Sequence, residues 1–449
     1  MTEASSHARF DEDIKPGSIP DKLASSPRYG WYVVAMLWFI SFFNYADRQA
    51  IFSVFPLLEK EFELDLIQKG WLGSSFAIVY GLGAPFAGYV IDHVRRKTAI
   101  LFGLHVWSVI CMATALSQNF RHLIFFRAAE GAGETFYYPA SMSLVSDFHG
   151  KRTRSRAMGL HQTSVYIGTI GGGFFAGLIG QYYGWRLSFV VFGGLGILLG
   201  FLLHKVLLEP KRGAADLQDT LHTEQPTAMA KLPLVETLRV IWSTPTVLTL
   251  LGAFICANFV AMVLLTWMPS YLYTNFNMSL ATSGLTATMF VQLASMVGAP
   301  LGGYLADRLR GYTPRGRMIV QCVGVLCGAP FVALCGMTHT VTGLLIALTF
   351  WGLFKGIYDA NIFASMFDVI RPEARGTAAG LMNCMGWLVG AFPAPIIIGI
   401  IGTKYSLGFA IATASMVYVM SGVFLLIGIV FLVKRDSAKM QAQLEQAAS

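Results

Sequence analysis

Five ionisable residues fall inside two of the chain's apolar stretches, where a charge is expensive and usually serves a function. Asp47 and Arg48 lie in the first stretch, and Arg127, Glu130 and Glu134 lie in a later one. Spacings of three, four and seven residues put the latter three on one stripe of a helix. Because three charges would not face lipid together, this stripe is expected to line an internal polar cavity, where a carboxylate can bind and release a proton.

Two of these residues have a second interpretation. Arg48 could form a structural ion pair with another helix rather than bind a ligand. Glu130 either partners Arg127 or is a second site for a proton. Arg127 itself would tune Glu134 or pair with Asp47.

A further pair of charges lies near the end of another apolar stretch. Lys355 and Asp359 are four residues apart, followed by Asn361. A lysine and an aspartate at this spacing can neutralise each other. Alternatively, Lys355 receives a carboxylate while Asp359 holds the lysine in place, and Asn383 and Gln292 add neutral hydrogen-bond donors.

Aromatic residues near these charges could wall the cavity, although packing against lipid or other helices is the alternative for each. They are Tyr45, Tyr137, Tyr138, Tyr166 and Trp387.

One short segment occurs twice. The sequence from Gly88 to Lys97 (GYVIDHVRRK) recurs from Gly303 to Gly311 (GYLADRLRG), about half a chain later and again at the end of an apolar run. Many secondary transporters are built from duplicated membrane halves that rock about a central site. Transport is therefore the first hypothesis.

The composition indicates a polytopic membrane protein. The chain is 55% hydrophobic and 13% charged, with 46 glycines and a mean hydropathy of +0.57; such a chain exposes apolar surface to lipid and uses glycine for close helix packing. Twelve stretches have about the 20 apolar residues that a spanning helix needs. They are residues 31–57, 69–91, 98–117, 121–145, 156–181, 185–208, 246–273, 282–306, 317–337, 340–367, 376–401 and 405–433.

Lysine and arginine concentrate in the loops after the even-numbered stretches, which places both termini in the cytoplasm. The net charge of +8 reflects this bias rather than a nucleic-acid partner. The expected organisation is a disordered cytoplasmic tail, an N-terminal six-helix bundle, a cytoplasmic linker with a short amphipathic helix near Leu234 to Val240, a C-terminal six-helix bundle and a cytoplasmic tail. The respective bounds are 1–30, 31–208, 209–244, 245–434 and 435–449.

Twelve spans in two halves and the repeated Gly-x-x-x-Asp-Arg/His-basic loop resemble the major facilitator superfamily over about residues 30–434. The resemblance implies an all-α fold of twelve transmembrane helices in two pseudo-symmetric six-helix halves. In that family the loop braces the cytoplasmic side of the outward-open state. It therefore implies gate-bracing roles for Asp92, Arg96, Asp307 and Arg308, rather than contact with substrate.

Two subgroups of the superfamily compete. The motif from Asn44 to Arg48, together with Arg127 and Glu134, resembles the anion:cation symporters that move sugar acids and other organic anions. Extended by Gln49, the same motif resembles the spinster-like proteins, some of which move lysolipids or sphingolipids. Both subgroups use the position of Glu134 as a coupling carboxylate.

Two further segments, TWMPSYL at residues 266–272 and GLMN at residues 380–383, favour the symporters. A glutamine that several symporters place in the fifth helix is Val165 here, with Gln162 or His161 as nearby substitutes. His161 itself is expected to pack or cap, with proton relay as the alternative.

The sequence contains no phosphate-binding loop of an ATP-driven pump and no nucleophile–base or His/Asp metal constellation of an enzyme. The expected function is proton-coupled symport of a small organic anion in the bacterial inner membrane, by a monomer that needs no metal or cofactor beyond the proton gradient. Asp47, Glu134 and Glu130 would carry protons. The candidate substrate ligands are Arg48, Tyr45, Arg127, Tyr138, Gln162, Gln292, Lys355, Asp359 and Asn383. The alternative is a spinster-like transporter of lysophospholipid or another amphiphile.

Overall fold

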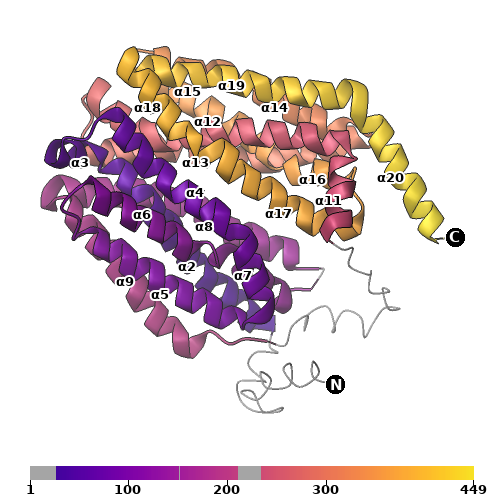
Figure 1. Cartoon of the computed structure of the whole chain (residues 1–449), viewed down its shortest axis with the longest axis horizontal. Helices are drawn as coiled ribbons and strands as arrows, with labels where there is room; N and C mark the ends of the chain where they lie inside the picture. The colour runs from indigo at the N-terminus through magenta and orange to yellow at the C-terminus, as the bar shows by residue number, and fades with distance from the viewer. Residues whose placement is uncertain (1–26, 151, 211–233, 449) are drawn as a thin grey trace.

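A computed structural model describes residues 27–150, 152–210 and 234–448, and the regular structure in these ranges is entirely helical (Figure 1). The predicted N-terminal tail, apart from its last four residues, and most of the predicted linker lie outside the described residues. The short amphipathic helix predicted at the end of the linker is confirmed as α11 (Leu234–Trp242).

The first half of the chain contributes α2 (Pro27–Ser53), α3 (Phe55–Phe62), α4 (Leu66–His93), α5 (Arg96–Thr114), α6 (Phe120–Glu134), α7 (Tyr137–Phe148), α8 (Arg154–Tyr183) and α9 (Trp185–Val206). After α11, the second half contributes α12 (Pro245–Asn275), α13 (Leu280–Arg310), α14 (Gly316–Met337), α15 (Val341–Asp359), α16 (Ile362–Phe367), the 3₁₀ turn η2 (Pro372–Ala374), α17 (Arg375–Met385), the π-helical η3 (Gly386–Ala391), α18 (Pro393–Lys404), α19 (Leu407–Ile427), the π-helical η4 (Gly428–Leu432) and α20 (Val433–Ala448).

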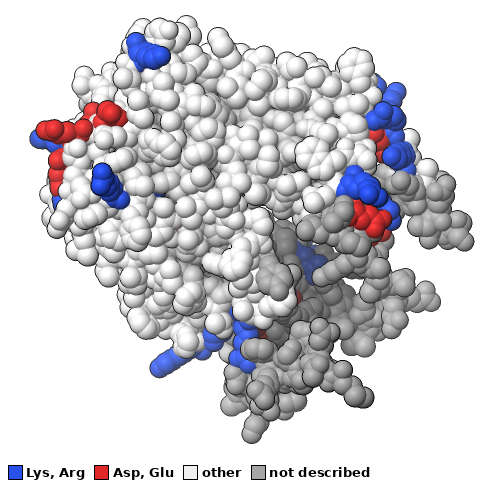
Figure 2. All heavy atoms as spheres, in the orientation of Figure 1, with Lys and Arg blue, Asp and Glu red and all other residues white. Residues whose placement is uncertain are grey.

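Within the described ranges, nine helical segments are long and apolar enough to cross a membrane. The other three predicted stretches correspond to α2, α4 and the pair α6–α7. Of these, α2 and α6 carry the five charges identified in the sequence, and α6 is only 15 residues long. Figure 2 shows the charged side chains near the two ends of the bundle, with few on the broad band between them. That band is what a lipid-facing surface requires.

Several predicted spans are interrupted helices rather than straight ones. The stretch 121–145 divides into α6 and α7, and the stretch 340–367 divides after Asp359. In the stretch 376–401 the helix takes a π turn, in which Phe392 N–H donates to Trp387 O at 2.8 Å, and Pro393 begins the next helix. Proline lacks an N–H group, so it suits a helix start, and π turns are frequent at functional sites.

The two halves meet closely at the end of the bundle that carries α3, here called the α3 end. Gly173 on α8 lies against the backbone of Gly284 on α13, and Gly70 on α4 lies against the backbone of Pro395 on α18, with no room for a Cβ at either glycine. Glycine allows two backbones to approach in this way. The contact between the halves at these two places is therefore backbone to backbone.

Toward the opposite end, here called the linker end because α9 finishes and α11 begins there, the same helix faces are free. Gly81 on α4 packs against Leu388, but Gly88, two turns further along the same face, has nothing within 4 Å of its Cβ position. On α8, Gly159 lies four turns before Gly173 and is equally free. Among the described residues, the halves touch backbone to backbone at the α3 end, and Gly88 and Gly159 make no such contact at the linker end.

Candidate transport site

The five charges predicted to line a cavity do come together. Asp47 and Arg48 on α2 lie beside Arg127, Glu130 and Glu134 on α6, and we call these five residues the central cluster. The side chains of Asp47 and Glu134 are fully buried, and Arg48 retains 11% exposure. The helical spacing therefore correctly predicted that Arg127, Glu130 and Glu134 share one face of α6.

Within the central cluster the charges form two ion pairs. Arg48 donates to Glu134 Oε2 from Nη2 at 2.6 Å and from Nε at 3.1 Å. Arg127 Nη1 donates to Glu130 Oε2 at 2.5 Å, and its Nη2 donates to the carbonyl oxygen of Arg48 at 2.8 Å. Of the two interpretations of Glu130, the structure has it as the partner of Arg127.

Asp47 is the acid of the central cluster that takes part in neither ion pair. It has no exposed surface, and neither carboxylate oxygen accepts a hydrogen bond from the described residues. Cys111 lies beside it, but the thiol of Cys111 donates to Phe189 O at 3.8 Å. Three carboxylates face two guanidinium groups, so the fully ionised cluster has one uncompensated negative charge. One proton would neutralise it.

Four aromatic rings surround the guanidinium of Arg48. Its Cζ lies 4.6 Å from the ring centres of Tyr45 and Phe76, 5.0 Å from that of Tyr80 and 5.5 Å from that of Trp387. Rings at these distances attract a cation through their negative faces. Phe76 and Tyr80 are one turn apart on α4, a helical spacing that could have identified them from the sequence.

The second half contributes a charged pair of its own. Lys355 Nζ donates to Asp359 Oδ2 along α15. Tyr166 on α8, in the first half, is near enough to interact electrostatically with both. Asp359 is 40% exposed, so the pair is open on one side. Lys355 and Asp359 thus face a residue of the opposite half.

The remaining predicted ligands, and Asn361 beside the charged pair, are more scattered. Asn361 is buried and donates to the backbone oxygen of Ile357. Tyr138 lies near Tyr45 and Tyr166. In the described residues, no hydrogen bond or ion pair links the other predicted ligands to the central cluster or to Lys355; these are Gln162, Gln292 and Asn383.

His161 is fully buried, and its Nε2 lies 3.0 Å from the hydroxyl of Tyr137. That hydroxyl donates to Leu37 O at 2.6 Å, so it accepts from His161 and fixes the tautomer with the proton on Nε2. This contact ties α2, α7 and α8 together, which agrees with the packing interpretation of His161.

The repeated loop makes ion pairs at the linker end of the second half. Arg317 Nη2 lies 2.9 Å from Asp307 Oδ1, and its Nη1 lies 2.9 Å from Asp368 Oδ1, which Arg310 also contacts at 2.6 Å. Arg308 is exposed. Burial raises the pKa of Asp368 above its ordinary value, although Arg317 and Arg310 act in the opposite direction.

The first half has a matching ion pair between Arg96 and Asp147. The side chain of Asp92 lies outside the described part of the structure. Asp147 and Asp368 were missed in the sequence, although both follow the end of a predicted span at corresponding places in the two halves. All of these described ion pairs join helices of one half.

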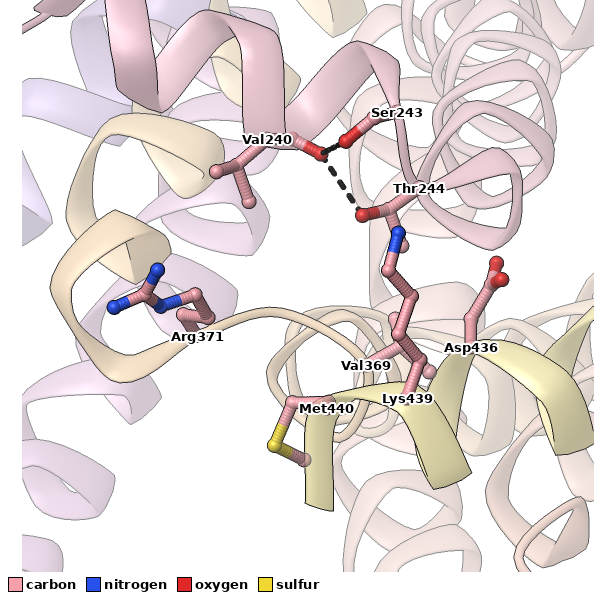
Figure 3. A pocket seen from close by; sticks show the side chains of 8 residues that line it. All are labelled: Val240, Ser243, Thr244, Val369, Arg371, Asp436, Lys439 and Met440. Atoms are coloured by element: carbon pink, nitrogen blue, oxygen red, sulfur yellow. Dashed lines mark hydrogen bonds between the residues drawn. The ribbon is translucent and has the colours of Figure 1, made fainter. Parts of the chain in front are cut away.

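A small cavity of about 70 Å³ lies at the linker end between α11, α20 and the segment after α16 (Figure 3). Its hydroxyls, on Ser243 and Thr244, both donate to Val240 O. Its carboxylate, Asp436, accepts from Thr246 N and Oγ1 at the start of α12. The cavity has room for only a few waters, which is too little for a transported organic solute.

Within the described residues, nine helical segments that could cross a membrane indicate a multi-pass membrane protein. The model of the Major Facilitator Superfamily matches residues 37–395. The chain belongs to this superfamily, whose members are secondary transporters rather than enzymes.

Individual relatives include two kinds of transporter. Protein spinster of Drosophila melanogaster is 26% identical over 400 residues, which cover 86% of this chain but only 64% of that protein, so this chain spans less than two thirds of its length. The hexuronate transporter of Bacillus subtilis (strain 168) is 24% identical over 356 residues, 78% of this chain and 83% of that protein. The probable galactarate/D-glucarate transporter GudP of Escherichia coli (strain K12) is 26% identical over 404 residues, 84% and 88% of the two chains.

The fold has a counterpart among solved structures. A bacterial homolog to the human lysosomal transporter spinster, in an inward-facing and unoccupied conformation, superposes with a TM-score of 0.77 at 22% sequence identity. The match covers 92% of this chain and 99% of that one. It supports the major facilitator fold and, at this identity, nothing finer.

Proposed function

We propose that the protein is a proton-coupled symporter of a small organic anion, a sugar acid or another carboxylate, that works by alternating access. It has twelve transmembrane helices in two bundles, residues 31–208 and 245–434, with α2, α4 and α6–α7 as the three spans in addition to the nine long apolar segments. It is a monomer of the bacterial inner membrane with both termini in the cytoplasm. The linker end is then the cytoplasmic end.

The observation that carries the proposal is the excess carboxylate of the central cluster. Among the described residues the carboxylate oxygens of Asp47 accept no hydrogen bond, and a buried charge without such bonds is strongly disfavoured. A proton on the cluster removes this cost, and release of the proton restores it. Asp47 shares the central cluster with the carboxylates of Glu134 and Glu130. Proton binding to this cluster would therefore change the relative energies of the outward-facing and inward-facing forms.

The anion would lie between cations of the two halves, Arg48 and Lys355. Each is held by one acid of its own half and lies beside aromatic residues. Tyr45 and Tyr138 would line this space, and Arg127 would act through Glu130 and the backbone of Arg48. The hexuronate and galactarate/D-glucarate transporters among the relatives support a sugar acid as substrate.

In the transport cycle, protons load the carboxylates when the site faces outward, and the anion enters against Arg48 and Lys355. Neutralisation lets the halves rock until the linker end opens. The carboxylates then release protons to the cytoplasm, and the restored negative charge expels the anion. Coupling requires that proton and anion favour the same transition, because a ligand with equal affinity for both states shifts nothing.

The role of Lys355 gives a direct test of the anion site. We expect Lys355→Gln to raise the KM for labelled glucuronate at least about tenfold, the size of a lost charge-assisted hydrogen bond. Lys404→Gln, at an exposed lysine of the α3 end, should change the KM little. Uptake into proteoliposomes measures both.

A double variant in which Lys355 and Asp359 are both neutral distinguishes a lysine that binds the anion from one that only balances Asp359. If Lys355 only balances Asp359, the double variant Lys355→Gln/Asp359→Asn should recover both melting temperature and KM. If Lys355 binds the anion, the double variant recovers stability but keeps the raised KM. Recovery of a normal KM would remove Lys355 from the substrate site.

A second candidate is transport of a lysophospholipid or another amphiphile. It is favoured by the spinster relatives and by the shared fold. The charges of Lys355 and Asp359, beside Tyr166, suit a carboxylate better than an acyl chain, which is why the anion is preferred.

A further inference from the structure

Arg48 is the point where the central cluster touches the opposite half of the molecule. Three of its ring contacts, to Tyr45, Phe76 and Tyr80, come from the first half, and one comes from Trp387 of the second. The Trp387 ring also lies 4.8 Å from that of Tyr80. Among the described residues, the contact between Arg48 and Trp387 is the cation–π contact that joins the two halves.

The local backbone sets Trp387 in this place. Trp387 lies in the π turn η3, and a Cβ on the flanking Gly386 or Gly390 would collide with Phe254 or Ile255 on α12. One face of the turn is thus fixed to the second half. On the other face, Gly81 of α4 leaves just enough room for Leu388 and Trp387 to approach. The indole of Trp387 thus reaches the first half from a turn that is packed firmly against α12.

We propose that Trp387 is a positioning residue that orients Arg48 and makes the second half respond to the charge of Glu134. The proposal rests on the proposed function, because it takes Glu134 as a site of proton coupling. Trp387 acts through Arg48, and no direct role in carrying a proton is assigned to it.

The physical basis is competition for one guanidinium. Glu134 draws Arg48 toward α6 with two hydrogen bonds to one oxygen, while the rings attract the same cation from α4 and η3. A cation–π contact strengthens when the cation is desolvated. When Glu134 becomes neutral, Arg48 loses its counter-charge. The attraction of the four aromatic rings, including Trp387 of the second half, then supplies a larger share of the stabilisation of Arg48.

Few described groups face this contact. Glu134 lies on α6 and Tyr80 on α4, and α2 presents Tyr45 and the neutral Asn44, whose Oδ1 accepts from Arg48 Nη2 at 3.3 Å. The second half presents the neutral Asn258 of α12 and Cys384 of α17 near the turn. Asp47, Glu130 and Arg127 complete the cluster behind Arg48. A response of Trp387 to pH can therefore be traced by neutralising Glu134.

The first test uses fluorescence and needs no substrate. The emission of Trp387 is isolated as the difference between wild type and Trp387→Phe in detergent micelles from pH 5 to pH 8. We expect this difference to change with pH in the Glu134-containing protein and to be flat when both proteins also carry Glu134→Gln. A difference that is independent of pH, or one that titrates identically in the Glu134→Gln background, would overturn the proposal.

The second test uses transport. Trp387→Leu should lower proton-driven glucuronate uptake about tenfold, consistent with loss of a desolvated cation–π contact, and alter its pH profile, while Trp387→Phe, which keeps a ring, recovers most of the activity. The matched control is Leu388→Ala, which removes packing against Gly81 without touching Arg48. Equal effects of Trp387→Leu and Leu388→Ala would reduce Trp387 to packing. If wild type moves no protons with any carboxylate, the proposed function fails, and the fluorescence test alone decides the role of Trp387.

Discussion

Glu134→Gln is expected to abolish proton-driven accumulation of the anion while sparing its exchange down a gradient. Glutamine has nearly the shape of glutamic acid and keeps an oxygen that can accept from Arg48, but it cannot release a proton. The two hydrogen bonds from Arg48 to a single oxygen of Glu134 show how directly the charge at this position controls the cation. A permanently neutral residue would leave Arg48 available to the anion and remove the link to the proton gradient.

The measurement compares two assays on the same proteoliposomes. Accumulation of labelled glucuronate under an imposed pH gradient should fall to the level of empty vesicles, and exchange of internal for external glucuronate at equal pH should stay within about threefold of wild type. Glu236→Gln, at an exposed position of α11, is the matched control and should behave as wild type in both. Normal accumulation by Glu134→Gln would show that Glu134 does not carry the coupling proton.

Asp47→Asn is expected to reduce proton-driven accumulation as strongly as Glu134→Gln does. Unlike most changes at a buried position, it is also expected to make the folded protein more stable. Asp47 is fully buried and its carboxylate oxygens have no hydrogen-bond donor among the described residues, and an uncompensated buried charge is costly. The neutral amide removes that cost. Accumulation should be lost, and the melting temperature in detergent at pH 8 should rise by several degrees.

Asp47→Glu serves as the control, because it restores an acid at nearly the same place and should recover part of the accumulation but none of the added stability. Two results would count against this view of Asp47. One is a melting temperature lowered by Asp47→Asn, which would indicate a partner for the carboxylate. The other is an undiminished accumulation of glucuronate by that variant.

Much of the helical architecture could be predicted from the sequence, because apolar length is a property of whole segments. Nine of the predicted stretches coincide with helices of sufficient length and apolarity in the described residues. What the hydropathy pattern missed is where helices break. The division between α6 and α7 and the π turn at Gly386 depend on hydrogen bonds within one or two turns, which an average over 20 residues does not detect.

The candidate site was predictable to the extent that helical spacing determines it. Three charges at spacings of three, four and seven must share a face, and the structure has Arg127, Glu130 and Glu134 beside α2. Which acid pairs with which arginine depends on the packing of two helices that are distant in sequence. Spacing alone therefore left Glu130 open between two roles, and it could not place Trp387 against Arg48 from the other half.

The most direct test of the central claim is proton movement into proteoliposomes that contain the purified protein and a pH-sensitive dye. Glucuronate, galactarate and other small carboxylates are added in one series, and lysophospholipids in another. The account predicts proton influx on addition of a carboxylate, and its loss in Glu134→Gln. No response to any carboxylate, together with a response to lysophospholipid, would contradict it and make the protein a transporter of amphiphilic lipids.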